Sequence, residues 1–151
     1  MKILVSSCLL GQNVRYDGGN CFMNSSWIAR LAASDQIVSL CPEVASGMSV
    51  PRAPIELKNG EVVDESGVVI TEKFRSLVDN LEAFINDNSI SMAIMKDKSP
   101  SCGVRQIYDG SFSGTLIEGQ GLISKELAKY VPVFCENELY EAEKYWNTLK
   151  I

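Results

Sequence analysis

Residues 25–33 read SSWIARLAA, and residues 37–41 read IVSLC. The first stretch follows a serine or asparagine N-cap and predicts a helix, whereas the second is a short, continuous apolar run that predicts a buried strand. The same kind of apolar run occurs before this pair at residues 3–7 and after it at residues 91–96. Because strands that alternate with helices form parallel sheets with right-handed crossovers, this unit indicates an α/β fold.

The rest of the chain supplies the other helices and one more strand. Behind a cap at Thr71, apolar residues recur at helical spacing from Phe74 to Ile85, which predicts a further helix. We expect three shorter elements after residue 121: a helix over residues 124–130, an edge strand over 131–134 and a closing helix over 139–149.

Two long segments, residues 42–70 and 97–121, are rich in turn-forming residues, and Asn59-Gly60 is a hairpin signal within the first. Both segments follow predicted strands, so they lie at the carboxyl ends of the sheet, where open α/β folds bind ligands. We predict a compact three-layer, Rossmann-like α/β fold over residues 1–151, as one domain with a short parallel sheet and long loops at the strand carboxyl ends. No Gly-x-Gly-x-x-Gly follows the first strand, so dinucleotide binding has no support.

The overall composition limits the class of protein and its partners. The chain has 151 residues, 46% of them hydrophobic and 22% charged, which is typical of one globular domain that forms its own core. A net charge of −5 provides no positive field for a nucleic-acid backbone. No apolar run is long enough for a membrane span or a signal peptide. We therefore expect a cytoplasmic protein without nucleic-acid or membrane partners; the sequence does not set its oligomeric state.

Histidine is absent from the sequence, and five cysteines are present. The lack of histidine excludes Ser–His and Cys–His catalysis and every histidine-containing metal site. Cys8, Cys41 and Cys102 follow three different predicted strands, so we expect them to converge at the carboxyl edge of the sheet. Converging thiolates without histidine suit an iron–sulfur cluster with one open iron, or a zinc site with three thiolates and one water that Cys21 could close. The alternative is that the cysteines are small buried apolar residues without a metal.

Polar residues flank two of these thiols. Glu43 lies two residues past Cys41, and Ser101 directly precedes Cys102. A carboxylate and a hydroxyl beside metal ligands form a candidate proton-transfer pair. Two arginines in predicted turns are candidates for contact with a polar substrate, with surface ion pairing as the alternative: Arg15 and Arg52.

Six short motifs, taken together and in this order, resemble the single-domain bacterial family that contains the thiouracil desulfidases. They extend over most of the chain, from the first strand to about Glu136. The motifs are Cys8-Leu9-Leu10-Gly11, Arg15-Tyr16-Asp17-Gly18, Cys41-Pro42-Glu43, Pro51-Arg52-Ala53-Pro54, Ser99-Pro100-Ser101-Cys102-Gly103 and Asp109-Gly110-Ser111-Phe112.

The resemblance implies a cofactor, a substrate and roles for single residues. The cofactor is a [4Fe-4S] cluster held by three cysteines, with an open fourth iron that takes the sulfur of a small-molecule thio-substrate. The reaction is removal of sulfur from 2- or 4-thiouracil, with Glu43 and Ser101 as the catalytic pair. The implied ligands are Cys8, Cys41 and Cys102. Cys21 and Cys135 lie outside the motifs, and we expect both to be dispensable for metal binding.

Three functions from different classes compete at this point. The first is a thiouracil-type desulfidase that works by non-redox hydrolysis, and the resemblance favours it. The second is a binding or sensing module stabilised by a metal, in which Glu43 has no catalytic role. The third is a sulfur-trafficking protein that carries persulfide on Cys102 or sulfur on a cluster.

Overall fold

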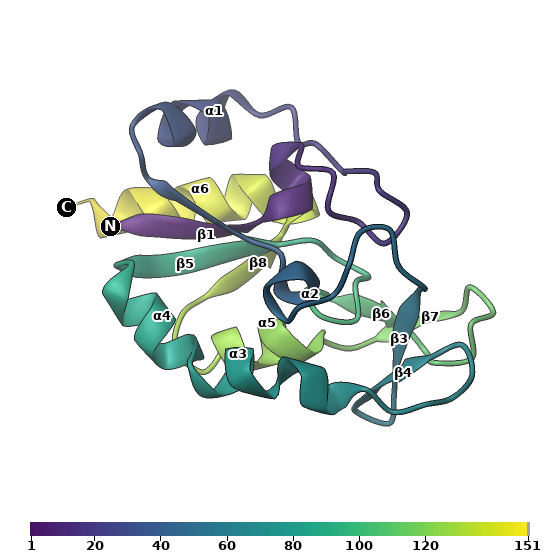
Figure 1. Ribbon diagram of the computed structural model, residues 1–151. Helices are drawn as coiled ribbons and strands as arrows, with labels where there is room; N and C mark the ends of the chain where they lie inside the picture. Colours follow the sequence, from purple (N-terminus) through teal and green to yellow (C-terminus); the bar gives the residue numbers. More distant parts are fainter. Residues whose placement is uncertain (151) are drawn as a thin grey trace.

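The computed structural model describes residues 1–150 and has a sheet of four parallel strands at its centre (Figure 1). The order across the sheet is β2-β1-β5-β8, so the last strand lies at an edge, as expected. The predicted three-layer, Rossmann-like α/β fold is therefore confirmed. The strands are β1 (Lys2–Ser6), β2 (Ile37–Leu40), β5 (Ile90–Met95) and β8 (Val133–Cys135).

Helices cover both faces of this sheet (Figure 1). Successive residues of a strand point to opposite faces. In β1, Ile3 and Val5 therefore pack with Trp146 on one face. Leu4 packs with Leu81 on the other face. The first face carries α1 (Ser26–Ala33) and α6 (Leu139–Leu149), and the second carries α3 (Arg75–Asp79), α4 (Leu81–Asp87) and α5 (Leu122–Leu127).

The helix expected after Thr71 is interrupted in the structure. A 3₁₀ turn, η2 (Thr71–Phe74), leads into α3, and the chain breaks again at Asn80 before α4. Nδ2 of Asn80 donates to the carbonyl of Ser76 at 2.7 Å, and such side-chain bonds compete with the helical backbone. The Thr71 hydroxyl makes no helix cap, because it accepts a hydrogen bond from the amide of Val62 at 2.9 Å.

Two antiparallel hairpins stand beyond the carboxyl ends of the sheet strands (Figure 1). The first turns at Asn59 and Gly60, both at positive φ, as the sequence predicts. The second is not predicted, because its strands of three residues carry too little alternation to be recognised. The hairpin strands are β3 (Ile55–Lys58), β4 (Glu61–Asp64), β6 (Gln106–Tyr108) and β7 (Leu116–Glu118).

Short helical turns, which the sequence analysis does not identify, directly follow three of the sheet strands. They are η1 (Ser7–Leu10) after β1, α2 (Pro42–Ala45) after β2 and η3 (Glu136–Glu138) after β8. Gly11 ends η1 at a φ of 90°, a left-handed conformation that favours glycine. These turns hold their side chains at the carboxyl edge of the sheet. No helix within residues 1–150 has the length and apolar character needed to cross a membrane.

Candidate active site

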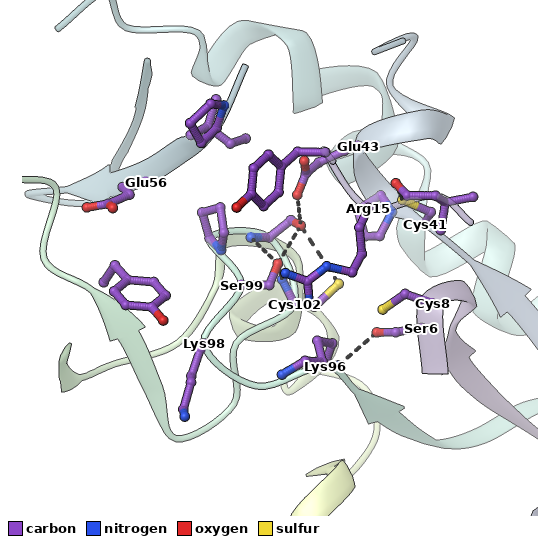
Figure 2. Close-up of a pocket in the computed structure, with 18 of the residues that line it drawn as sticks. Ser6, Cys8, Arg15, Cys41, Glu43, Glu56, Lys96, Lys98, Ser99 and Cys102 are labelled. Carbon is purple, nitrogen blue, oxygen red and sulfur yellow. Dashed lines mark hydrogen bonds between the residues drawn. The ribbon is translucent and has the colours of Figure 1, made fainter. Parts of the chain in front are cut away.

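A cavity of about 490 Å³ lies at the carboxyl ends of β1, β2 and β5 (Figure 2). Its lining comes from the segments that follow these strands, which is where open α/β sheets bind ligands. The structure brings together here the three proposed cluster ligands, the catalytic pair and both arginines that the sequence suggested as substrate contacts, but not Cys21, the additional ligand considered for a zinc site. The residues brought together are Cys8, Arg15, Cys41, Glu43, Arg52, Ser101 and Cys102.

Tight turns present the three candidate ligand thiols. Cys8 lies in η1, Cys41 is the N-cap of α2, and Cys102 lies in the loop after β5, where it is buried. A Cβ at Gly103 would lie 2.7 Å from the carbonyl oxygen of Ser99, so this loop requires glycine there. Figure 2 shows the sulfur atoms of Cys8 and Cys102 on the same side of the cavity. No cysteine within residues 1–150 forms a disulfide.

The environments of Cys8 and Cys102 oppose the ionisation of these two thiols. Burial raises the pKa of Cys8 to about 12, and the neighbouring thiolates of Cys21 and Cys41 add to the rise. Burial also raises the pKa of Cys102 to about 12, although a hydrogen bond from the Ser6 hydroxyl acts in the opposite direction. Metal ligation requires thiolates, so metal binding at this site has to displace protons.

The donor set of the cavity consists of thiols, which are the usual ligands of iron–sulfur clusters. Within residues 1–150, no group of three or more His, Cys, Asp or Glu side chains is arranged to hold a metal ion. The thiolates of a cluster bind different irons, so they stand farther apart than the ligands of one zinc ion. Three thiols on the wall of one cavity, in a chain without histidine, therefore suit an iron–sulfur cluster.

Glu43 lies in the first turn of α2 and is held from two sides. Its Oε1 atom accepts a hydrogen bond from Nε of Arg52 at 3.0 Å. Its Oε2 atom accepts one from Oγ of Ser101, also at 3.0 Å. The Glu43 side chain is 12% exposed, and Ser101 is 1% exposed. The carboxylate and the hydroxyl that the sequence pairs are thus in direct contact, although 58 positions separate them.

Ser99, which the sequence analysis does not single out, extends this contact into a chain of hydrogen bonds. Its Oγ atom lies 3.1 Å from Oγ of Ser101. It also accepts hydrogen bonds from the amides of Ser101 and Cys102, at 3.2 and 3.1 Å. The Ser101 hydroxyl lies 3.0 Å from Oε2 of Glu43 and 3.8 Å from Sγ of Cys102. With its one proton directed to the nearer, charged acceptor, Ser101 accepts from Ser99. The chain therefore runs from Ser99 through Ser101 to Glu43 and leaves Ser101 one free lone pair; the repeated serine around Pro100 is its signal in the sequence.

Arg15 lies on a more open part of the cavity lining, with its side chain 33% exposed. Its Nη1 atom donates to Sγ of Cys21 at 2.7 Å, and its Nε atom is 3.7 Å from Oδ1 of Asp17. The amide of Cys21 donates to the carbonyl of Cys8 at 2.9 Å. Cys21 is therefore next to the site, but neither Cys21 nor Cys135 lines the cavity.

Lys96 and Asp97 are cavity residues that the sequence analysis also misses. Nζ of Lys96 lies 2.7 Å from Oε2 of Glu136. Asp97 is 5% exposed, and its Oδ1 atom accepts hydrogen bonds from the amides of residues 104–106 at 2.9, 2.9 and 3.1 Å. Burial raises the pKa of Asp97, but these hydrogen bonds outweigh burial and lower the pKa overall. Asp97 thereby fixes the loop that carries Cys102; an aspartate directly after a strand is its only sequence signal.

Thiols, a carboxylate and hydroxyls gather at the carboxyl edge of a parallel sheet. Together with the similarities that follow, this arrangement places the chain among the α/β enzymes. The profile of the family described as 2-thiouracil desulfurase matches residues 3–138. The chain belongs to this family, and the resemblance seen in the sequence motifs is confirmed.

Two similar proteins cover almost the whole chain. The "Uncharacterized protein YbbK" of Bacillus subtilis (strain 168) is 36% identical over 148 residues, which cover 91% of this chain and 97% of that protein. A solved structure described as the [4Fe-4S]-dependent thiouracil desulfidase TudS has a TM-score of 0.93 and 38% identity. That match covers 97% of this chain and 98% of the other, so the fold is shared from end to end.

Proposed function

We propose that this protein removes sulfur from a thiolated pyrimidine of the thiouracil type and releases uracil and sulfide. One observation carries the proposal: three thiols from three strand ends share a cavity with the hydrogen-bonded Glu43–Ser101 pair. The 2-thiouracil desulfurase family and the similarity to a [4Fe-4S]-dependent thiouracil desulfidase support the same reaction. The reaction balances without redox change, because the oxygen of water replaces sulfur at the thiocarbonyl carbon and two protons leave with the sulfide.

Cys8, Cys41 and Cys102 would hold the [4Fe-4S] cluster and leave its fourth iron open. When bound, the cluster supplies a Lewis-acidic iron that binds the thiocarbonyl sulfur and polarises the adjacent carbon. Neither of the other two cysteines, Cys21 and Cys135, lines the cavity, which supports a set of three protein ligands.

Glu43 and the two serines would move the proton of the attacking water. A water molecule that donates to the free lone pair of Ser101 would be connected to the Glu43 carboxylate through the Ser101 hydroxyl alone. Ser101 can accept that proton while it passes its own to Oε2 of Glu43, and Ser99 holds the Ser101 hydroxyl in the orientation this transfer needs. Glu43 then returns the proton to the departing sulfur. A carboxylate takes this role because the chain contains no histidine.

Arg15 would contact the polar edge of the substrate. Its guanidinium lines the cavity, keeps 33% of its surface exposed and is steadied by Cys21 and Asp17. The carbonyl oxygen of a pyrimidine ring is an acceptor suited to its remaining N–H groups. The proposed partner is therefore a small-molecule thio-substrate.

Anaerobic reconstitution with iron and sulfide, followed by assays with 2-thiouracil and 4-thiouracil, tests the proposed function. We expect a brown protein that turns over repeatedly and releases one sulfide for each uracil formed. A fully loaded protein that forms no uracil from either compound would overturn the proposal. A colourless zinc protein would instead support the metal-stabilised module. Formation of a single uracil per protein, with the sulfide kept on the cluster and not released, would support sulfur trafficking.

A further inference from the structure

Arg52 is a buried charged side chain of the cavity wall with several protein partners. Its side chain is 6% exposed, and its three guanidinium nitrogens all donate to protein acceptors. Nε donates to Oε1 of Glu43 at 3.0 Å, Nη1 to the carbonyl of Ser49 at 3.0 Å, and Nη2 to the carbonyl of Val14 at 2.8 Å. These contacts differ from the substrate contact that the sequence suggested for Arg52.

The acceptors of Arg52 belong to separate segments of the site. Val14 lies in the loop that follows η1, Glu43 lies in α2, and the amide of Arg52 itself donates to the carbonyl of Tyr16 at 2.8 Å. The carbonyl of Val14 also faces Sγ of Cys41 at 4.0 Å. One guanidinium thus ties the proposed base to two loops of the cavity wall.

The two oxygens of Glu43 have different partners. Arg52 holds Oε1, so the carboxylate plane is fixed and Oε2 is left to accept the hydrogen bond from Ser101. Without the arginine, the carboxylate is free to rotate away from Ser101. A lysine would keep the positive charge, but its single nitrogen cannot reproduce the planar fork that reaches three acceptors.

We propose that Arg52 is a positioning residue that sets the orientation of the Glu43 carboxylate toward Ser101. It acts through Glu43 and makes no contact with the substrate. This inference rests on the proposed function only for the role of Glu43 as base; the ion pair itself is independent of any reaction.

Kinetics of the reconstituted enzyme test the positioning role. We expect Arg52→Met to lower kcat about 10²-fold, because small misplacements of reacting groups cost this much. KM should stay within about threefold, since a group that only orients the base leaves substrate binding unchanged. Arg52→Lys should recover little of the lost kcat. Added guanidinium ion should raise kcat of Arg52→Ala, whereas methylammonium ion should not. Arg75→Met is the matched control, because Arg75 pairs with Glu72 and Asp79 on the surface, 68% exposed.

A stability cycle on the same reconstituted proteins tests the ion pair without any assay of activity. Arg52→Met leaves the Glu43 carboxylate, only 12% exposed, without its cation, and we expect the melting temperature to fall by several degrees. The double variant Arg52→Met/Glu43→Gln removes both charges. We expect its loss to be smaller than the sum of the two single losses, because the residues are in contact.

Each alternative result assigns Arg52 a different role and overturns the proposal. A raised KM with unchanged kcat would make Arg52 a substrate contact. Loss of iron from Arg52→Met would make it a support for the Cys41 ligand. If the melting-temperature loss of the double variant equals the sum of the two single losses, Arg52 and Glu43 are not coupled. This result would overturn the inference even if the wild-type protein desulfurated neither thiouracil. Full activity in Arg52→Met beside an inactive Glu43→Gln would overturn the inference and leave the proposed function intact.

Discussion

Two segments of the cavity wall are built in opposite ways. In the buried wall, residues 99–104, Ser101 and Cys102 are 1% and 5% exposed, and the backbone amides bond to Ser99 and Asp97. In the exposed wall, residues 12–20, no residue is buried, and local turns supply most of the hydrogen bonds.

This difference separates two requirements of a reaction site. Proton transfer requires fixed distances between the groups that exchange the proton, and the buried wall provides them through hydrogen bonds to its own backbone. Entry of a substrate requires a wall that solvent can reach, and the exposed wall meets this requirement with Arg15. Variants matched between the two walls test whether the walls differ in this way.

The largest effect is expected for the thiol of the buried wall. Cys102→Ser should lose the cluster and all desulfuration, because the thiolate is a proposed ligand. Cys21→Ser, next to the exposed wall, and Cys135→Ser should keep full iron and sulfide content. The measurement is iron and acid-labile sulfide per protein, beside uracil formation. Loss of iron from either control, with the fold intact, would show that the ligand set is wrong.

Glu43→Gln should keep the cluster and lower the desulfuration rate by about 10²- to 10⁴-fold. Glutamine nearly matches glutamate in shape but accepts no proton at neutral pH. Iron content and uracil formation are measured on the same sample. Full activity would place the base elsewhere, and loss of iron would show that Glu43 itself holds metal.

The hydrogen-bonded serines of the buried wall should act as one unit. Ser99→Ala and Ser101→Ala should each lower kcat, by about 10²-fold or less, because water can replace a positioning hydroxyl. The double variant should be no slower than the slower single variant, since groups that act together are not additive. Multiplied losses in the double variant would show that the serines act separately.

Asp97 and Asp17 accept backbone hydrogen bonds behind the buried wall and within the exposed wall, respectively. Asp97→Ala leaves three amides without their acceptor and should cost about 3 kcal/mol of unfolding free energy. Asp17→Ala, at a side chain that is 52% exposed, should cost under about 0.5 kcal/mol. Denaturant titration measures both changes, and similar losses in the two variants would remove the distinction between the walls.

The stabilisation by Asp97 should depend on pH. Its pKa is lower in the folded protein than in the unfolded chain. The contribution is therefore complete above the unfolded value of about 4 and disappears as the pH falls through the lower folded value. The difference in stability between the wild type and Asp97→Ala should accordingly shrink in acid, below about pH 4.

The smallest effect on the reaction is expected on the exposed wall. Arg15→Met should raise KM about tenfold, the loss of one hydrogen bond to a charged group. The value of kcat and the iron content should stay unchanged, because this contact is made equally in the ground state and the transition state. Steady-state kinetics measures both constants, and a fall in kcat would move Arg15 into the chemical step.

Local sequence patterns are enough to predict the parallel sheet, the location of the site and the family of this protein. Apolar periodicity is a property of neighbouring residues, so the sequence predicts the parallel sheet and the turn at Asn59-Gly60. Because the carboxyl ends of parallel strands lie at one edge of the sheet, cysteines that follow different strands are predicted to meet there. Together with the short motifs, these patterns locate the site and name the family, because neither inference requires the position of any side-chain atom.

Which polar groups meet depends on how distant segments pack against one another. Arg52 donates to Glu43, and the Ser99 hydroxyl lies 3.1 Å from that of Ser101. The amide of Val104 reaches Asp97 only because the loop between them turns at Gly103, where a side chain would not fit. Hydrogen bonds are short and directional, so a few ångströms of backbone placement decide between alternative acceptors. Residue spacing in the sequence does not specify which acceptor each donor reaches. The proposed proton route can therefore be traced only in the folded protein, where distant segments pack together.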